Sequence, residues 1–128
     1  MSRLRRKVFQ MKKIAVASEG SRVSDHFGLC KDFMIYSVDG ARINHVEMIA
    51  NPGHRPCELP EFVETTGATT LITGSMGKAA AENFHRMGIE VILGVKGESE
   101  QVVQTYLKGE LESTGELCES WICEFFEN

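Results

Sequence analysis

Short apolar runs alternate along the chain with segments rich in glycine, proline and polar residues. Runs of this length, with β-branched or alternating apolar positions, are typical of β-strands. The segments with such a pattern are 13–18, 32–38, 42–49, 69–73 and 90–95. Asp39-Gly40, between the second and the third, favours a two-residue hairpin turn. The last run is almost continuously apolar, so we expect it to be a central parallel strand buried on both faces.

Three later segments have apolar residues at helical spacing. We expect helices at about 60–66, 78–87 and 99–108. Between 19 and 31 the chain lacks such a period, and we expect a loop with one helical turn near Phe27. The order β-β-β-α-β-α-β-α predicts an α/β fold of three layers, α/β/α, around a five-stranded mixed sheet whose later part is parallel.

The length of 128 residues fits a single domain with its own hydrophobic core. Apolar residues make up 42% and charged residues 25% of the chain, which indicates a soluble globular protein rather than a disordered one. We expect the folded domain to span 11–115, with a flexible basic extension at 1–10 and an acidic, aromatic tail at 116–128. The aromatic residues of the tail should dock on this domain or on a partner.

Charge is distributed unevenly along the chain. The net charge is −4, but four basic residues lie within 1–10, where there is no acid, so the remainder carries −8. A surface of that sign repels phosphate backbones, and we expect no nucleic-acid partner. No apolar run is long enough to span a bilayer and no secretory signal follows the basic N-terminus. We therefore expect a cytoplasmic protein, without a membrane partner, whose four cysteines are reduced.

Two loop segments each combine an imidazole with a thiol. His26 and Cys30 stand four apart after the first strand, and His54 and Cys57 stand three apart in the next long loop. Soft nitrogen and sulfur donors on loops suit zinc, copper or an iron–sulfur centre better than magnesium. If the first segment is helical, His26 and Cys30 share a face and form a two-point clamp. Two other interpretations stay open: His26 caps the following turn, and Cys30 is a small buried hydrophobe.

Further residues near these loops could support a bound group. Asp25 could accept a hydrogen bond from the ring of His26 and fix its tautomer. The N–H groups of Gly74, Ser75 and Gly77, at the start of the second helix, would favour an anion such as a metal–sulfide cluster. Tight packing of strand against helix is the alternative explanation of these glycines.

Hydrolytic chemistry lacks its usual motifs in this chain. There is no Gly-x-Ser-x-Gly turn and no His-Glu-x-x-His helix. A two-metal nuclease would need carboxylates in or beside its central strands, and 14–17 and 71–73 contain none. We therefore expect no hydrolytic activity.

Four stretches of the chain match the pattern of a known family. They are Ile-Ala-Val-Ala-Ser at 14–18, Val-Ser-Asp-His-Phe-Gly-Leu-Cys at 23–30, Gly-His-Arg-Pro at 53–56 and Gly-Ile-Glu-Val-Ile-Leu-Gly-Val at 88–95. The chain from about Met11 to Gly115 thereby resembles the nitrogenase iron–molybdenum cofactor biosynthesis family, which includes dinitrogenase accessory proteins and small stand-alone homologues. The His-Phe-Gly element at 26–28 is the most specific part of the resemblance.

The resemblance implies a ribonuclease-H-like α/β/α fold and a non-catalytic role in binding, carrying or storing an iron–sulfur or iron–molybdenum cluster. It places the histidine of the family at His26, with Asp25, Phe27 and Gly28 beside it. The cysteine that often follows in the small homologues corresponds to Cys30.

Our leading hypothesis is a metallocluster carrier with His26 and Cys30 as ligands and His54 or Cys57 completing the set. Such a carrier would exchange its cluster with a donor or acceptor protein. The alternative, from a different class, is a metal-free regulatory or interaction module that acts through the tail at 116–128.

Overall fold

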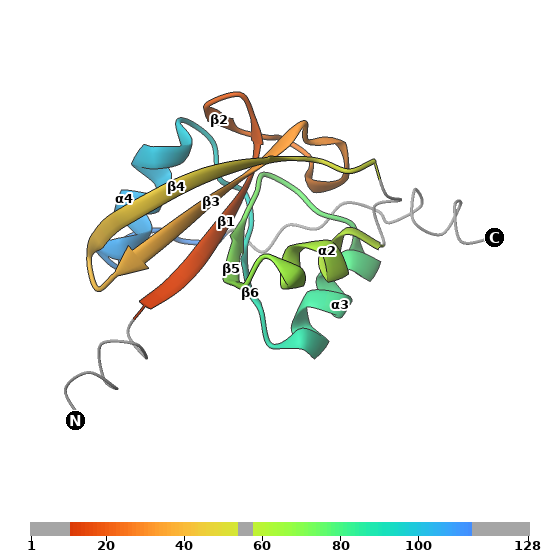
Figure 1. Cartoon of the computed structure of the whole chain (residues 1–128). Helices are drawn as coiled ribbons and strands as arrows, with labels where there is room; N and C mark the ends of the chain where they lie inside the picture. Colours follow the sequence, from red (N-terminus) through yellow and green to blue (C-terminus); the bar gives the residue numbers. More distant parts are fainter. Residues whose placement is uncertain (1–10, 54–57, 114–128) are drawn as a thin grey trace.

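The strands and helices follow the order expected from the sequence (Figure 1). The computed structural model describes residues 11–53 and 58–113. The strands are β1 (Met11–Glu19), β2 (Arg22–Val23), β3 (Asp32–Asp39), β4 (Arg42–Ala50), β5 (Ala68–Ile72) and β6 (Glu90–Ile92). The helices are the 3₁₀ turn η1 (Phe27–Leu29), α2 (Leu59–Thr65), α3 (Lys78–Met87) and α4 (Ser99–Leu107). Every predicted element is present, with ends that differ by up to about three residues, and within the described residues the short β2 is the one strand that was not predicted.

β1 lies in the middle of a mixed sheet with the strand order β4-β3-β1-β5-β6, and β2 pairs with the end of β1. On one side β1 pairs antiparallel with β3, where Ala15 lies opposite Ile35. On the other side it pairs parallel with β5, where Ala15 lies opposite Leu71. The predicted mixed sheet is confirmed, and it has six strands rather than five because β2 joins it.

The strand expected in the centre of the sheet, at 90–95, lies at an edge instead. β6 covers only Glu90–Ile92 and, among the described strands, pairs with β5 alone. Leu93 and Val95 are each 5% exposed, but they belong to the loop that follows. Within the run, Ile92, Leu93 and Val95 are buried, whereas Glu90 is exposed and Val91 is half-buried. The expected burial on both faces therefore holds only for the later part of the run, and the expected central position is wrong.

Alternate side chains of β1 supply two apolar cores on opposite faces of the sheet, as the two-residue period of a strand requires. Ala15 and Ala17 belong to the core under α2 and α3, whereas Ile14 and Val16 belong to the core under α4. The buried helical residues of the first core are Leu59, Val63, Ala80 and Phe84, and those of the second are Val102 and Val103. The apolar residues that recur at helical spacing along α3 and α4 thus lie on the side of each helix that packs on the sheet.

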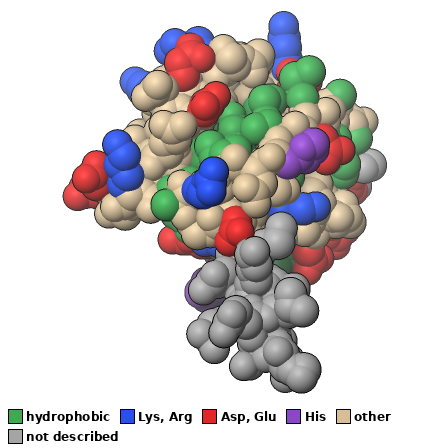
Figure 2. Space-filling model, turned by 60° about the vertical axis from the view of Figure 1, so that its left-hand side comes forward, with side chains coloured by type: hydrophobic (Ala, Val, Ile, Leu, Met, Phe, Trp, Pro, Cys, Tyr) green, Lys and Arg blue, Asp and Glu red, His purple; other side chains and the backbone are tan. Residues whose placement is uncertain are grey.

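The sheet is less completely covered on the α4 side, at its β3–β4 edge. Val46 is 41% and Met48 61% exposed, and both lie on the face that also holds the half-buried Met34 and Ile43. Figure 2 shows apolar side chains gathered in one band across the surface in view. This band is an ordinary consequence of covering a broad sheet face with one helix.

The β3–β4 hairpin turns at Gly40 and Ala41, because Asp39 pairs with Arg42 across the turn. Gly40 has a φ of 64°, and no non-glycine residue in the described part of the chain has a positive φ. The turn therefore lies one residue later than the Asp39-Gly40 pattern suggests, and only its first position requires glycine.

Within the described segments, no helix combines the length and apolarity that crossing a bilayer would need. The extension predicted at 1–10 and the tail predicted at 116–128 lie outside the described residues, so both stay predictions.

Candidate functional site

Three loops meet where the parallel strands β1, β5 and β6 end. The N–H of Gly74, in the β5–α3 loop, donates to the carbonyl of Ser24, in the loop after β2, at 3.0 Å. The carbonyl of Gly74 in turn accepts from the N–H of Gly94, in the β6–α4 loop, at 2.6 Å. The N–H of Val23 donates to the carbonyl of Gly97 at 2.8 Å and joins the first loop to the third. The carboxyl ends of strands are where open α/β sheets place ligands.

Gly74 is required by this convergence. A Cβ built at Gly74 would lie 2.7 Å from the carbonyl oxygen of Asp25 and 2.8 Å from both its Cα and the carbonyl oxygen of Ser24. These are backbone atoms, which cannot rotate away as the end of a side chain can. The β5–α3 loop therefore approaches the loop after β2 as closely as it does only because residue 74 has no side chain.

His26 lies on the exposed surface of the joined loops. It forms an isolated parallel bridge with Ser75, and its ring Nδ1 lies 2.7 Å from Ser75 Oγ. Ser75 Oγ also donates to the main-chain carbonyl of Asp25 at 2.7 Å. Ser24 Oγ donates to the carbonyl of His26 at 3.0 Å, so the main chain is held on both sides of the ring. The ring is exposed but anchored.

Phe27 and Gly28, the other residues of the His-Phe-Gly element, face the protein rather than solvent. Phe27 is 1% exposed, and its ring centroid lies 5.4 Å from that of Phe84 and 5.9 Å from that of Phe33. Gly28 is half-buried within η1. Phe27 therefore serves as the apolar anchor of the loop that carries His26.

Cys30 lies at the end of the same loop, directly after η1, and its side chain is in the core. It is 3% exposed and belongs to the cluster that contains Phe27. Burial raises the pKa of its thiol from 9.0 to about 12, and a hydrogen bond from Asn51 acts more weakly in the other direction. Asn51 Nδ2 donates to the Cys30 carbonyl at 2.8 Å and lies 3.8 Å from Sγ. The thiol is accordingly protonated at neutral pH and behaves as a small buried hydrophobe.

The two-point clamp of His26 and Cys30 is not formed in this structure. It assumed a helical segment, but only the three residues of η1 are helical, as a 3₁₀ turn, and both His26 and Cys30 are extended residues that flank it. His26 consequently faces outward and Cys30 inward. His54 and Cys57 lie outside the described residues, and their role as ligands stays a prediction. In 11–53 and 58–113, no three His, Cys, Asp or Glu side chains gather as a metal-ion site would need.

A family profile described as dinitrogenase iron-molybdenum cofactor matches residues 11–109 of the chain, well over half of it. The chain belongs to this family. The match covers the whole described fold up to the end of α4, including all three loops of the candidate site.

Several relatives of this family member have nearly its length. An uncharacterized protein of Methanocaldococcus jannaschii, MJ0580, is 26% identical over 108 residues, which cover 80% of this chain and 92% of that protein. The crystal structure of PH0822 has a TM-score of 0.75 and 29% identity, covering 81% of this chain and 96% of that one. The apo form of the orange protein from Desulfovibrio gigas has a TM-score of 0.70 and 28% identity, covering 82% and 94%.

Ser75 is the residue of the candidate site whose contact the sequence did not reveal. Its N–H was the expected contribution, whereas the structure shows its hydroxyl bonded to His26, 49 positions away in the chain. The available signal was that both residues follow adjacent parallel strands, whose carboxyl ends meet at one sheet edge. Of the other glycines proposed to support an anion, Gly74 uses its N–H internally, and Gly77 is the N-cap of α3.

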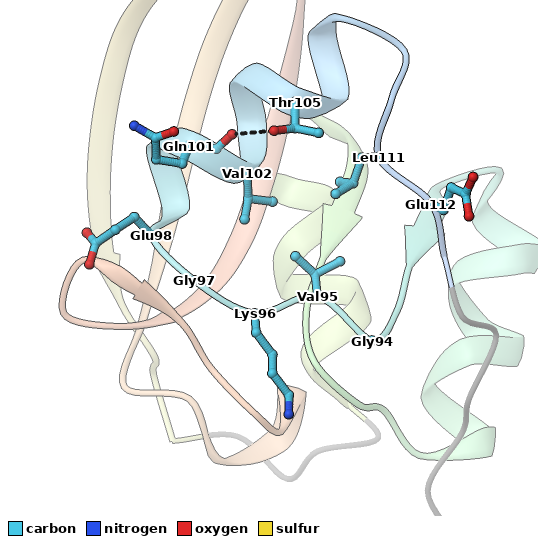
Figure 3. A pocket seen from close by; sticks show the side chains of 10 residues that line it. All are labelled: Gly94, Val95, Lys96, Gly97, Glu98, Gln101, Val102, Thr105, Leu111 and Glu112. Atoms are coloured by element: carbon cyan, nitrogen blue, oxygen red, sulfur yellow. Dashed lines mark hydrogen bonds between the residues drawn. The ribbon is translucent and has the colours of Figure 1, made fainter.

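A separate cavity of about 330 Å³ lies between α4 and the β6–α4 loop (Figure 3). Val95, Val102 and Leu111 point toward its centre, whereas the charged ends of Lys96 and Glu98 extend away from it. The hydroxyl of Thr105 donates a hydrogen bond to the carbonyl of Gln101 at 3.0 Å. Apolar side chains surround its centre, and among the predicted site residues that the structure describes, none lines the cavity.

Proposed function

We propose that this member of the dinitrogenase iron-molybdenum cofactor family is a non-catalytic carrier of an iron–sulfur or iron–molybdenum type cluster. The cluster would be held at the exposed edge around His26. The observation that carries the proposal is an imidazole that is both exposed and anchored, on loops joined at the carboxyl ends of the parallel strands. The family match and the likeness to a solved apo form, a form defined by a missing ligand, support it.

The donor chemistry fits in part. An imidazole whose second nitrogen is fixed by a hydrogen bond is a well-oriented ligand for iron. Cys30 does not fit in the conformation described, because a protonated thiol in the core would have to break its packing with Phe27 to reach a cluster. We therefore propose His26 as the primary ligand, with His54 or Cys57 as the candidates to complete the set.

A site with few protein ligands agrees with a role in transfer. Each iron of a cluster that arrives with its own sulfides still needs a terminal ligand, so a carrier that supplies only one or two exposed side chains leaves the other positions to a partner protein or to small ligands. The same exposure lets a partner protein reach the cluster and replace the ligands. We propose that the partners are a cluster donor and a cluster acceptor, and that the exchange takes place in the cytoplasm.

The fold would supply the rigid support for this exchange. With α2 and α3 on one face of the sheet and α4 on the other, we propose that the domain is a three-layer, ribonuclease-H-like α/β/α structure. In that arrangement the three joined loops stand on the ends of buried strands, which limits their motion.

The test is reconstitution of the full chain without oxygen, first with iron and sulfide and then with molybdate added. We expect the wild-type protein to develop visible absorption and to retain iron and sulfide after desalting. His26→Ala should retain about a tenth of that iron or less, because a ligand is lost. His45→Ala removes another exposed imidazole, on the edge strand β4, and is the matched control that should behave as wild type.

Two results would contradict the carrier function. The first is a wild-type protein that stays colourless and metal-free under all conditions. The second is His26→Ala retaining as much iron as His45→Ala. A third outcome would favour the metal-free interaction module. In that outcome neither the wild-type protein nor a variant without residues 116–128 binds iron, and only the wild-type protein binds a partner protein in a pull-down.

A further inference from the structure

Ser75 sits between a carbonyl and an imidazole. Its Oγ lies 2.7 Å from the carbonyl oxygen of Asp25 and 2.7 Å from Nδ1 of His26. The first distance is the ordinary one for a hydroxyl that bonds to a carbonyl oxygen, and the second is short for a bond between nitrogen and oxygen, so both contacts are made.

The available hydrogens determine the direction of each bond. A serine hydroxyl has one hydrogen to donate, and a main-chain carbonyl can only accept. Ser75 must therefore donate to Asp25, and its lone pair then faces Nδ1 of His26. The second contact is favourable only if Nδ1 carries the hydrogen and donates it to Ser75.

The surrounding main chain keeps this geometry fixed. The N–H of Phe27 donates to the carbonyl of Ser75 at 2.9 Å, and the N–H of Gly74 donates to the carbonyl of Ser24 at 3.0 Å. At Gly74 the backbones of the two loops are so close that an added Cβ would lie 2.7 Å from the carbonyl oxygen of Asp25. The hydroxyl of Ser75 is thus held beside Nδ1 of His26, where it favours the tautomer that carries a hydrogen on this atom.

We propose that Ser75 is a positioning residue that holds neutral His26 as the Nδ1–H tautomer and so places the lone pair of the ring on Nε2. Free histidine side chains favour the opposite tautomer, with the hydrogen on Nε2, so the protein has to impose this state. Nε2 is then the nitrogen that accepts a metal. The consequence for a cluster rests on the proposed function, whereas the tautomer does not.

Long-range ¹H–¹⁵N correlation spectra of the full-length protein test the tautomer directly. They are recorded in mildly alkaline buffer, and the tautomer is compared only for rings whose spectra show the neutral form. We expect His26 to show the Nδ1–H pattern in the wild type and to shift to predominantly Nε2–H in Ser75→Ala. Ser75→Thr keeps a hydroxyl and should restore the wild-type pattern. The signals of His45 and His85, on β4 and α3, should be the same in all three proteins.

An Nε2–H pattern for His26 in the wild type would overturn the proposal, as would a pattern unchanged by Ser75→Ala. A purely structural role for Ser75 predicts altered stability with the tautomer unchanged, so the spectra separate the two roles.

Iron uptake by the wild type and by Ser75→Ala then tests the carrier function independently of the tautomer. Ser75→Ala should bind the reconstituted cluster about 10- to 100-fold more weakly than wild type, as loss of a supporting hydrogen bond to a metal ligand usually does. Wild-type protein that binds no cluster but shows the Nδ1–H signature would contradict the carrier function while supporting the positioning role of Ser75.

Discussion

His26 and Cys30 stand four residues apart in one loop, yet they occupy opposite environments. The imidazole is on the surface, held by hydrogen bonds to Ser75 and to the backbone, whereas the thiol is 3% exposed in the apolar core. Two side chains that could each bind a metal thus differ in their accessibility. The comparison indicates how a loop that is fixed in the core at one end can hold an exposed side chain in place at its other end.

The two ends are stabilised by different interactions. At the Cys30 end, aromatic packing of Phe27 against Phe33 and Phe84 supplies several kcal/mol and excludes water. At the His26 end, the bonds are polar and exposed, and each contributes about 1 kcal/mol or less. Substitutions at the core end should therefore affect folding, and substitutions at the exposed end should affect binding.

The largest effect is expected from Phe27→Ala, which removes the apolar anchor of the loop. Loss of a fully buried phenyl ring should lower the free energy of unfolding by about 3–5 kcal/mol, measured by urea denaturation. The neighbouring Leu29→Ala is the control, because Leu29 is 63% exposed and should change stability by about 0.5 kcal/mol or less. Equal effects of the two substitutions would mean that η1 is not anchored as described.

Gly74→Ala should have the next largest effect. The added methyl group would meet the backbone of Asp25, so the loops must separate, at a cost of about 1–3 kcal/mol. The His26–Ser75 contact should be lost as well, which the histidine spectra would detect. Gly40→Ala is the comparison, since it strains a positive φ at the far hairpin with no atom within 4 Å. It should destabilise the fold without changing the His26 signals.

A pH dependence is expected at the core end. Folding raises the pKa of the Cys30 thiol from 9.0 to about 12, so between these values the unfolded chain loses a proton that the folded chain keeps. The stabilisation is fully present below pH 9 and falls by up to about 1.4 kcal/mol per pH unit above it.

Cys30→Ala isolates this effect, because other groups also titrate in alkali; the pKa of Tyr36 is raised by burial too. Urea denaturation of both proteins across this range should show a steeper alkaline loss of stability in the wild type. Parallel slopes would indicate that the thiol is accessible to water in the folded state. Alkylation by iodoacetamide at Cys30 should likewise be slow until the protein unfolds.

Local patterns were sufficient to predict nearly every element of the fold. The strand at 69–73 and the helix at 78–87 were predictable because each buries one side at a regular period. The position of β6 at the sheet edge was not, because strand order depends on which long-range pairs form, and the apolar run reports only burial.

The candidate site was predictable in its location but not in its chemistry. The His-Phe-Gly element pointed to the loop that carries His26, and the carboxyl ends of the strands pointed to the edge where that loop lies; a functional site there stays a prediction. A spacing of four suggests a shared helical face, yet the three-residue 3₁₀ turn between His26 and Cys30 is too short to show a period. The partnership of His26 with Ser75 depends on the pairing of β1 with β5, which neither local segment encodes.

The smallest effect on folding is expected from His26→Ala, although it should have the largest effect on metal uptake. The ring is exposed, and its contact with Ser75 is a single surface hydrogen bond, so the free energy of unfolding should change by about 0.5 kcal/mol or less. Urea denaturation without metal measures this, beside the iron content of the same preparation. A loss above about 1.5 kcal/mol would show that the contact of His26 with Ser75 itself holds the loops together. Any fall in iron uptake would then reflect a damaged loop rather than a missing ligand, and the separation between a core end and a binding end would no longer hold.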